Sequence, residues 1–168
     1  MDIKELKPTS IWHYFDAITG VPRPSKKEER IREFLLNFAK EQNLEVKVDK
    51  TGNVVITKEA TPGCEGAPTV ILQAHMDMVC EKNGDVKHDF ERDPIETYID
   101  GEWVKARGTT LGADNGIGMA AAMAVLADKE LKHGRIQALF TVDEETGLTG
   151  AFGLESGMID GSYTHLTL

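Results

Sequence analysis

Apolar residues recur at helical spacing in two segments near the beginning of the chain. The apolar stripe that follows Ser10 predicts a helix over residues 10–18, because serine is a favourable N-cap residue. Ser25 and Glu28 have the spacing of a capping box, which predicts a second helix beginning at Ser25. The apolar face of this second helix consists of Ile31, Phe34, Leu35, Phe38 and Ala39. Each helix is therefore expected to pack one face against an apolar surface.

Three apolar segments farther along have the pattern of β-strands. Val46 and Val48 alternate with charged residues, and a tight turn at residues 51–53 joins them to a second strand over residues 54–56. Residues 69–74 form a continuous β-branched and apolar run, which is typical of a strand buried on both faces. We therefore expect this third strand to lie centrally in a sheet.

The second half of the chain has the pattern of a hairpin followed by a helix and a strand. Asp100-Gly101 lies between two short apolar pairs and predicts a two-residue hairpin loop. An alanine-rich helix is predicted over residues 119–127 and a further strand over residues 135–142. A strand, a helix and a strand of these lengths predict a parallel crossover connection. The predicted fold class is therefore α/β, a three-layer arrangement with helices on both faces of the sheet.

Composition and charge exclude several classes of function. The 168 residues suffice for one domain, and 40% apolar and 28% charged residues are typical of a globular protein. Acidic residues outnumber basic ones 28 to 19, and the net charge of −9 disfavours a nucleic-acid partner. No apolar run approaches the roughly 18 residues of a membrane span, so no membrane partner is expected. Without a signal-peptide pattern, and with Cys64 and Cys80 in no metal-binding spacing, the sequence favours a cytoplasmic location.

Histidine and acidic residues occur in three short segments, at residues 75–77, 112–116 and 143–145. The first and third segments follow predicted strands, and functional groups of α/β sheets gather at the carboxyl ends of strands. We therefore expect all three segments to meet at one rim of the sheet. Imidazole and carboxylate are ligands of zinc and similar ions, and several carboxylates with one histidine supply enough charge for two ions. Adjacent Glu144 and Glu145 allow one carboxylate to bind metal while the other moves a proton.

Each of these segments has a simpler explanation when it is taken alone. His75 by itself is more typical of a hydrogen-bonded structural histidine, and Asp114 of a turn or a helix cap. Glu144-Glu145 by itself is more typical of a solvated turn. The three segments together, each following a strand or opening a helix, favour the metal site.

Two other kinds of site are less well supported. Gly112, Gly116 and Gly118 precede a helix, but their G-x3-G-x-G spacing matches neither the dinucleotide fingerprint nor a P-loop. Cys80 lies near His75 in the sequence, yet a buried structural thiol is more common than a nucleophile without a flanking lysine or helix N-terminus. Nucleotide binding and cysteine catalysis are therefore disfavoured.

Three motifs carry a family resemblance. They are Gln73-Ala74-His75-Met76-Asp77-Met78-Val79, Leu111-Gly112-Ala113-Asp114-Asn115-Gly116-Ile117-Gly118 and Val142-Asp143-Glu144-Glu145-Thr146-Gly147. These motifs resemble the aminoacylhistidine dipeptidases, also called cytosol non-specific dipeptidases or peptidase D, which are dinuclear zinc metallopeptidases related to carnosinases and aminoacylases. The resemblance implies a zinc-exopeptidase-like catalytic domain, of which residues 1–168 form a truncated N-terminal part. The lid (dimerisation) domain and the C-terminal part of the catalytic domain are expected to be absent.

The resemblance also implies a role for each site residue. His75 would ligate one zinc ion, Glu145 the other, and Asp114 would bridge both, with cobalt or manganese as alternative metals. Glu144 would be the general base that takes a proton from the attacking water, and Asp77 would accept the second ring N–H of His75. The implied substrates are small unblocked dipeptides, including aminoacyl-histidine. The resemblance further implies a cis peptide bond between Asp114 and its neighbour, and a homo-oligomer.

Two ligands that such enzymes need do not occur in this chain. They are an acidic residue on the strand after residues 157–161 and a histidine far downstream. His165 could substitute, but its neighbours alternate as in a strand, so a strand-face histidine is favoured. We therefore expect weak metal binding and little peptidase activity from the chain alone. The alternative function is a non-catalytic α/β module for binding or assembly that retains the peptidase scaffold.

Overall fold

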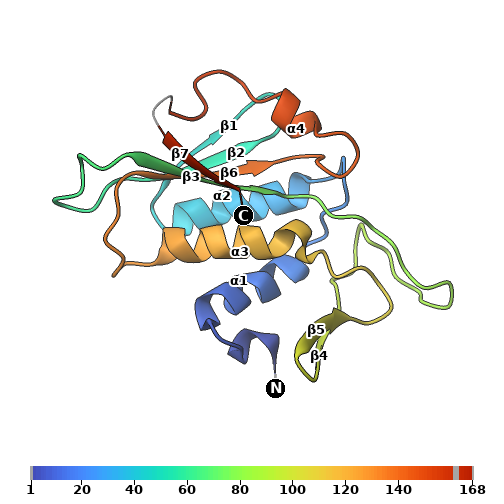
Figure 1. Cartoon of the computed structure of the whole chain (residues 1–168). Helices are drawn as coiled ribbons and strands as arrows, with labels where there is room; N and C mark the ends of the chain where they lie inside the picture. Colours follow the sequence, from blue (N-terminus) through green and yellow to red (C-terminus); the bar gives the residue numbers. More distant parts are fainter. Residues whose placement is uncertain (1, 161–162, 168) are drawn as a thin grey trace.

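The computed structural model describes residues 2–160 and 163–167, the last five by their backbone only. A five-stranded sheet forms the centre of the fold (Figure 1). Its strands, in spatial order, are β1 (Glu45–Val48), β2 (Val54–Lys58), β6 (Ile136–Thr141), β3 (Thr69–His75) and β7 (Tyr163–Thr167). The helices are η1 (Ile3–Glu5), α1 (Thr9–Thr19), α2 (Glu29–Glu41), α3 (Ala113–Ala127) and α4 (Thr149–Phe152), and β4 (Thr97–Asp100) and β5 (Trp103–Ala106) form a separate hairpin.

The strand pairing confirms the predicted parallel crossover. β3 and β6 are parallel neighbours joined through α3, and β7 pairs in parallel with the other side of β3. β2 is antiparallel to β6, and β1 is antiparallel to β2. β3 is therefore an interior strand, as its apolar run predicts. Its parallel pairing with β6 brings the carboxyl ends of both strands to one rim, where His75 pairs with Thr141.

The long helices lie on one face of the sheet. α2 and α3 contact the strands directly, and α1 packs on α3 on the side away from the sheet (Figure 1). Alternation along the strands sends Ile56, Leu72 and Phe140 into the large core beneath the sheet. Within the described residues, no helix combines the length and apolar character needed to cross a membrane.

The opposite face differs from the predicted three-layer arrangement. Val55, Ile71 and Leu139 point to this face and form a small second cluster with Met158. In the described part of the chain this cluster is covered by the segment after β6, which includes the single-turn helix α4, and not by a long helix (Figure 1). The α/β class is confirmed, and among residues 2–160 and 163–167 a full helical layer covers one face of the sheet.

The predicted capping box at Ser25 is wrong. The second helix begins at Glu29, and its N-cap Glu28 makes no side-chain capping hydrogen bond. The Ser25 hydroxyl donates instead to the carboxylate of Asp77, over 2.7 Å. The Glu28 carboxylate accepts the backbone N–H groups of Asp143 and of nearby Lys26.

Two other element boundaries differ slightly from the prediction. The β4–β5 hairpin is confirmed, but Asp100 pairs with Trp103, so its two-residue loop is Gly101-Glu102. Gly101 has a φ of +62°, a left-handed conformation that glycine adopts without strain. The alanine-rich helix begins at Ala113 and not at Met119, and the backbone of Asp114 and Asn115 departs from helical geometry. The other predicted helix and strands lie within about two residues of their expected ends.

Two valines that pair across β1 and β2, Val48 and Val54, allow a matched test of core packing. Val54 is fully buried, whereas its partner Val48 is 44% exposed. Val54→Ala is expected to lower the free energy of unfolding by about 2 kcal/mol, since a buried side chain loses apolar contacts. The same change at Val48 should cost less than about 0.5 kcal/mol. Urea unfolding followed by circular dichroism measures both, and equal losses would contradict the difference in burial between the two valines.

Candidate metal centre

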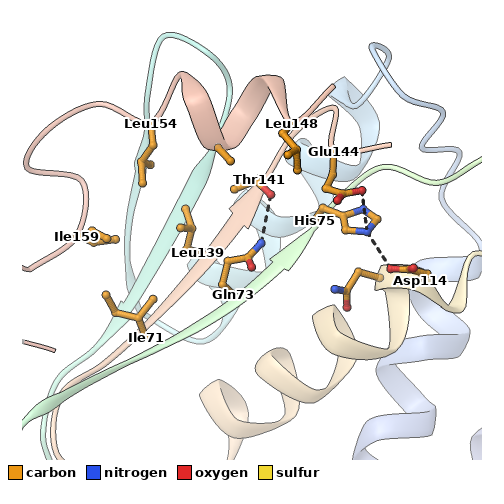
Figure 2. A pocket seen from close by; sticks show the side chains of 12 residues that line it. Ile71, Gln73, His75, Asp114, Leu139, Thr141, Glu144, Leu148, Leu154 and Ile159 are labelled. Carbon is orange, nitrogen blue, oxygen red and sulfur yellow. Dashed lines mark hydrogen bonds and ion pairs between the residues drawn. The ribbon is translucent and has the colours of Figure 1, made fainter. Parts of the chain in front are cut away.

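Three segments that are distant in sequence converge at the carboxyl end of β3. His75 is the last residue of that strand and is 4% exposed. Its Nε2 atom lies 2.9 Å from an oxygen of Asp114 and 3.8 Å from an oxygen of Glu144 (Figure 2). One ligand atom each from His75, Asp114 and Glu145 lie within 4.8 Å of one another. Donor atoms at such spacing are within reach of one divalent cation or of two adjacent ones.

The second ring nitrogen of His75 faces Asp77. Nδ1 lies 3.0 Å from the backbone carbonyl oxygen of Asp77 and 3.3 Å from its carboxylate. Burial lowers the pKa of His75, but hydrogen bonds to Asp77 and Asp114 and the nearby charge of Glu144 outweigh burial and raise it to about 9. With Nδ1 held by Asp77, Nε2 is the nitrogen that points to Asp114 and Glu144.

The Asp77 carboxylate is fully buried and has several donors around it. It accepts the Ser25 hydroxyl and the backbone N–H groups of Glu144 and Glu145, the last two over 3.0 and 3.2 Å. Burial alone would raise the pKa of Asp77, but these hydrogen bonds and the one to His75 hold it well below its usual range. Asp77 therefore stays ionised and fixes the backbone of both glutamates, a contact for which the sequence contains no signal.

The same loop is held by two further buried side chains that sequence reasoning missed. The N–H of Val142 donates to the side-chain oxygen of Asn53, and the N–H of Asp143 donates to the Glu28 carboxylate, over 3.1 and 3.0 Å. The sequence pattern predicts a turn at Asn53 and a helix cap at Glu28, and no spacing links either residue to residues 142–145. Four consecutive peptide N–H groups thus each have a buried side-chain acceptor from another segment.

Glu28, Asp77 and Asp143 form a second acidic cluster beneath the loop. Burial raises the pKa of Glu28. The Asp143 carboxylate accepts the hydroxyls of Thr146 and Thr149. Since all three carboxylates accept donors from the protein, this cluster is explained by the architecture of the loop.

Asp114 and Glu145 are the more accessible members of the site. The Asp114 side chain is 83% exposed and lies at the start of α3, and its peptide bond to Asn115 is cis. Glu145 is partly buried, and this burial, with the nearby charges of Asp114 and Glu144 adding to it, raises its pKa. Both carboxylates are accessible from the solvent side of the rim.

A cavity of about 430 Å³ opens beside His75, Asp114 and Glu144. It lies over β3 and β6 on the face opposite α2 and α3 (Figure 2). Half of its lining residues are aliphatic, and Gln73, Asn115 and Thr141 are polar members in addition to the three site residues. A mostly apolar concavity with a few convergent polar groups is the usual form of a small-molecule site.

The remaining sequence candidates lie outside this constellation. Burial raises the pKa of the Cys80 thiol, which is the opposite of what a nucleophilic cysteine needs. His165 belongs to β7, where it pairs with Ile71, but its side chain lies outside the described residues. The donor set of one imidazole and neighbouring carboxylates fits a divalent transition metal such as zinc.

Comparison with known proteins agrees with this chemistry. Residues 71–166 match the sequence profile of peptidase family M20/M25/M40. The cytosol non-specific dipeptidase of Escherichia coli (strain K12) is 52% identical over 158 residues, which cover 94% of this chain and 33% of that relative. The crystal structure of aminoacylhistidine dipeptidase from Vibrio alginolyticus superposes with a TM-score of 0.96 at 55% identity, covering 99% of this chain and 34% of the other.

A more distant structure shares the fold. A tripeptidase from Staphylococcus aureus has a TM-score of 0.79 at 24% identity, covering 96% of this chain and 43% of its own. The chain spans about a third of the length of the two dipeptidases, 33% and 34% respectively. The resemblance to aminoacylhistidine dipeptidases is confirmed, and the chain belongs to peptidase family M20/M25/M40.

Proposed function

We propose that this chain carries part of the active site of a metal-dependent dipeptidase. The observation that supports this most strongly is the convergence of His75, Asp114 and Glu145 donor atoms within 4.8 Å at the rim of the sheet. The proposed substrates are small unblocked dipeptides, including aminoacyl-histidine, and the proposed metal is zinc at two adjacent positions. Membership of a peptidase family and the small cavity beside the site support this proposal.

Each side chain has a distinct part in the proposed reaction. His75 and Glu145 would each hold one metal ion and Asp114 would bridge the two. Bound metal would supply a Lewis acid for the scissile carbonyl and acidify the attacking water. Glu144, which lines the cavity, would accept the proton of that water and transfer it to the leaving amine. Asp77 would keep the His75 ring oriented through Nδ1.

We also propose the molecular context of this site. Residues 1–168 would form the N-terminal part of the catalytic domain of a cytoplasmic enzyme that assembles as a homo-oligomer. The chain covers 33% of the Escherichia coli relative, so the two remaining metal ligands would come from outside it. The alternative of a non-catalytic assembly module stays a prediction, and zinc-dependent dipeptide hydrolysis by this chain would exclude it.

The three ligands in this chain should hold metal only weakly. After dialysis against metal-free buffer, elemental analysis is expected to find less than one zinc per chain, because each ion has fewer than the usual three protein ligands. Hydrolysis of an aminoacyl-histidine dipeptide should be near background. Two tightly held zinc ions per chain would contradict this expectation.

The two adjacent glutamates should respond differently to the same substitution. Glu145→Gln is expected to weaken Co²⁺ binding by about tenfold or more, since a charged ligand is lost. Glu144→Gln should leave Co²⁺ affinity nearly unchanged, because its proposed role is proton transfer. Titration of each variant with Co²⁺, followed by visible absorption, measures the difference. An equal loss in both variants would contradict the assigned roles.

Metal affinity should depend on pH through His75. Its pKa is raised to about 9 in the metal-free chain, and only the neutral imidazole binds metal. The apparent affinity for Co²⁺ should therefore rise about tenfold per pH unit up to about pH 9 and fall as the pH is lowered. Titrations at about pH 6, 7 and 8 test this slope. A constant affinity over that range would contradict a metal ligand at His75 whose pKa is raised to about 9.

A further inference from the structure

Arg23 is buried between the two loops that carry His75 and Asp114, and the proposed reaction gives it no role. The side chain is 2% exposed, among the most buried large side chains of the described residues. Its Nη1 donates to the backbone carbonyl oxygens of Met76 and Asp77, over 3.1 Å each. Its Nη2 donates to the carbonyl oxygen of Gly112. One guanidinium thus joins the loop after β3 to the segment that opens α3.

Two glycines leave room for this guanidinium. A Cβ atom on Gly112 would lie 2.5 Å from Nη2 of Arg23, and one on Gly116 would lie 2.7 Å from the same atom. Both distances are far below van der Waals contact, so any side chain there would displace the arginine. These glycines belong to the spacing considered above for nucleotide binding, and the close approach of Arg23 accounts for them.

The charge of Arg23 is retained despite its burial. Desolvation lowers the pKa of Arg23 to about 10, and the neighbouring charges of Asp77, Asp114 and Glu145 oppose this decrease. The group is therefore cationic at neutral pH. Its hydrogen bonds go to carbonyl oxygens, so the carboxylates that would bind metal stay free of it.

We propose that Arg23 is a positioning residue that couples the loop after β3 to the start of α3 and so sets the distance between His75 and Asp114. This inference rests on the proposed function, in which these two side chains ligate metal. Arg23 itself does not touch the metal or the substrate. The planar guanidinium of arginine donates hydrogen bonds in two fixed directions, which suits this role, whereas the ammonium group of lysine has no such fixed geometry.

Two substitutions separate the effect of the guanidinium geometry from that of its charge. Arg23→Lys keeps the positive charge and loses the planar guanidinium, whereas Arg23→Met loses both. Arg30, an exposed arginine on α2, provides the control substitution Arg30→Met. Circular dichroism first establishes that each variant is folded. If Arg23→Met does not fold, Arg23→Lys, which keeps the buried charge, is the variant that tests the proposal. Co²⁺ affinity should fall about tenfold in Arg23→Lys and remain unchanged in Arg30→Met. Hydrogen exchange in the metal-free chain should become faster in residues 76–80 and 110–116 and stay unchanged elsewhere.

The possible outcomes distinguish this inference from the proposed function. Equal Co²⁺ affinity of wild type and folded Arg23→Lys would overturn the positioning role and leave the proposed metal site intact. Faster exchange throughout the chain would also overturn the positioning role, since it indicates general destabilisation. A wild-type chain that binds no Co²⁺ would overturn the proposed function and this inference with it.

Discussion

The buried carboxylate of Asp77 is the interaction on which the rest of the site depends. Burying a lone carboxylate costs several kcal/mol unless donors surround it. Here the donors come from Ser25 before α2 and from the N–H groups of Glu144 and Glu145 after β6, and His75 lies beside the same carboxylate. Asp77 is satisfied only when these segments meet, so the hydrogen bonds that stabilise the fold also assemble the candidate metal ligands.

The loop after β6 is likewise held by buried side chains from distant segments. The backbone N–H groups of residues 142–145 do not pair within a strand or a helix, because the chain leaves β6 here and turns toward α4. Asn53 and Glu28 supply buried acceptors for the first two of them, and Asn53 also donates to Gly150 at the end of the loop. A loop fixed at both ends by buried side chains holds Glu144 and Glu145 with little conformational freedom, which favours a defined ligand geometry.

The features that rest on local patterns were predictable from the sequence, and those that rest on distant buried pairs were not. The strand over residues 69–74 and its parallel crossover follow from a continuous apolar run and from element lengths, and the convergence of His75 with Glu144 follows from the strand-end rule. Ser25 and Arg23 could not be found this way, because their partners lie more than 50 residues away and include backbone carbonyls that carry no sequence signal. The covering of the second sheet face by the segment after β6 was not predicted, because the apolar pattern of a strand shows that a face is apolar without showing what covers it.

Arg23 and His75 supply positive charge beside the clustered carboxylates at the rim of the sheet. Asp77, Asp114 and Glu145 lie close together with Glu144, and such a group needs nearby positive charge. A proton on His75 supplies part of it, which is why the pKa of His75 rises to about 9. A divalent cation would displace that proton but would leave the charge of Arg23 in place, since the guanidinium binds carbonyl oxygens behind the site. Arg23 therefore offsets part of the permanent negative charge, while His75 would exchange its proton for metal in the proposed site.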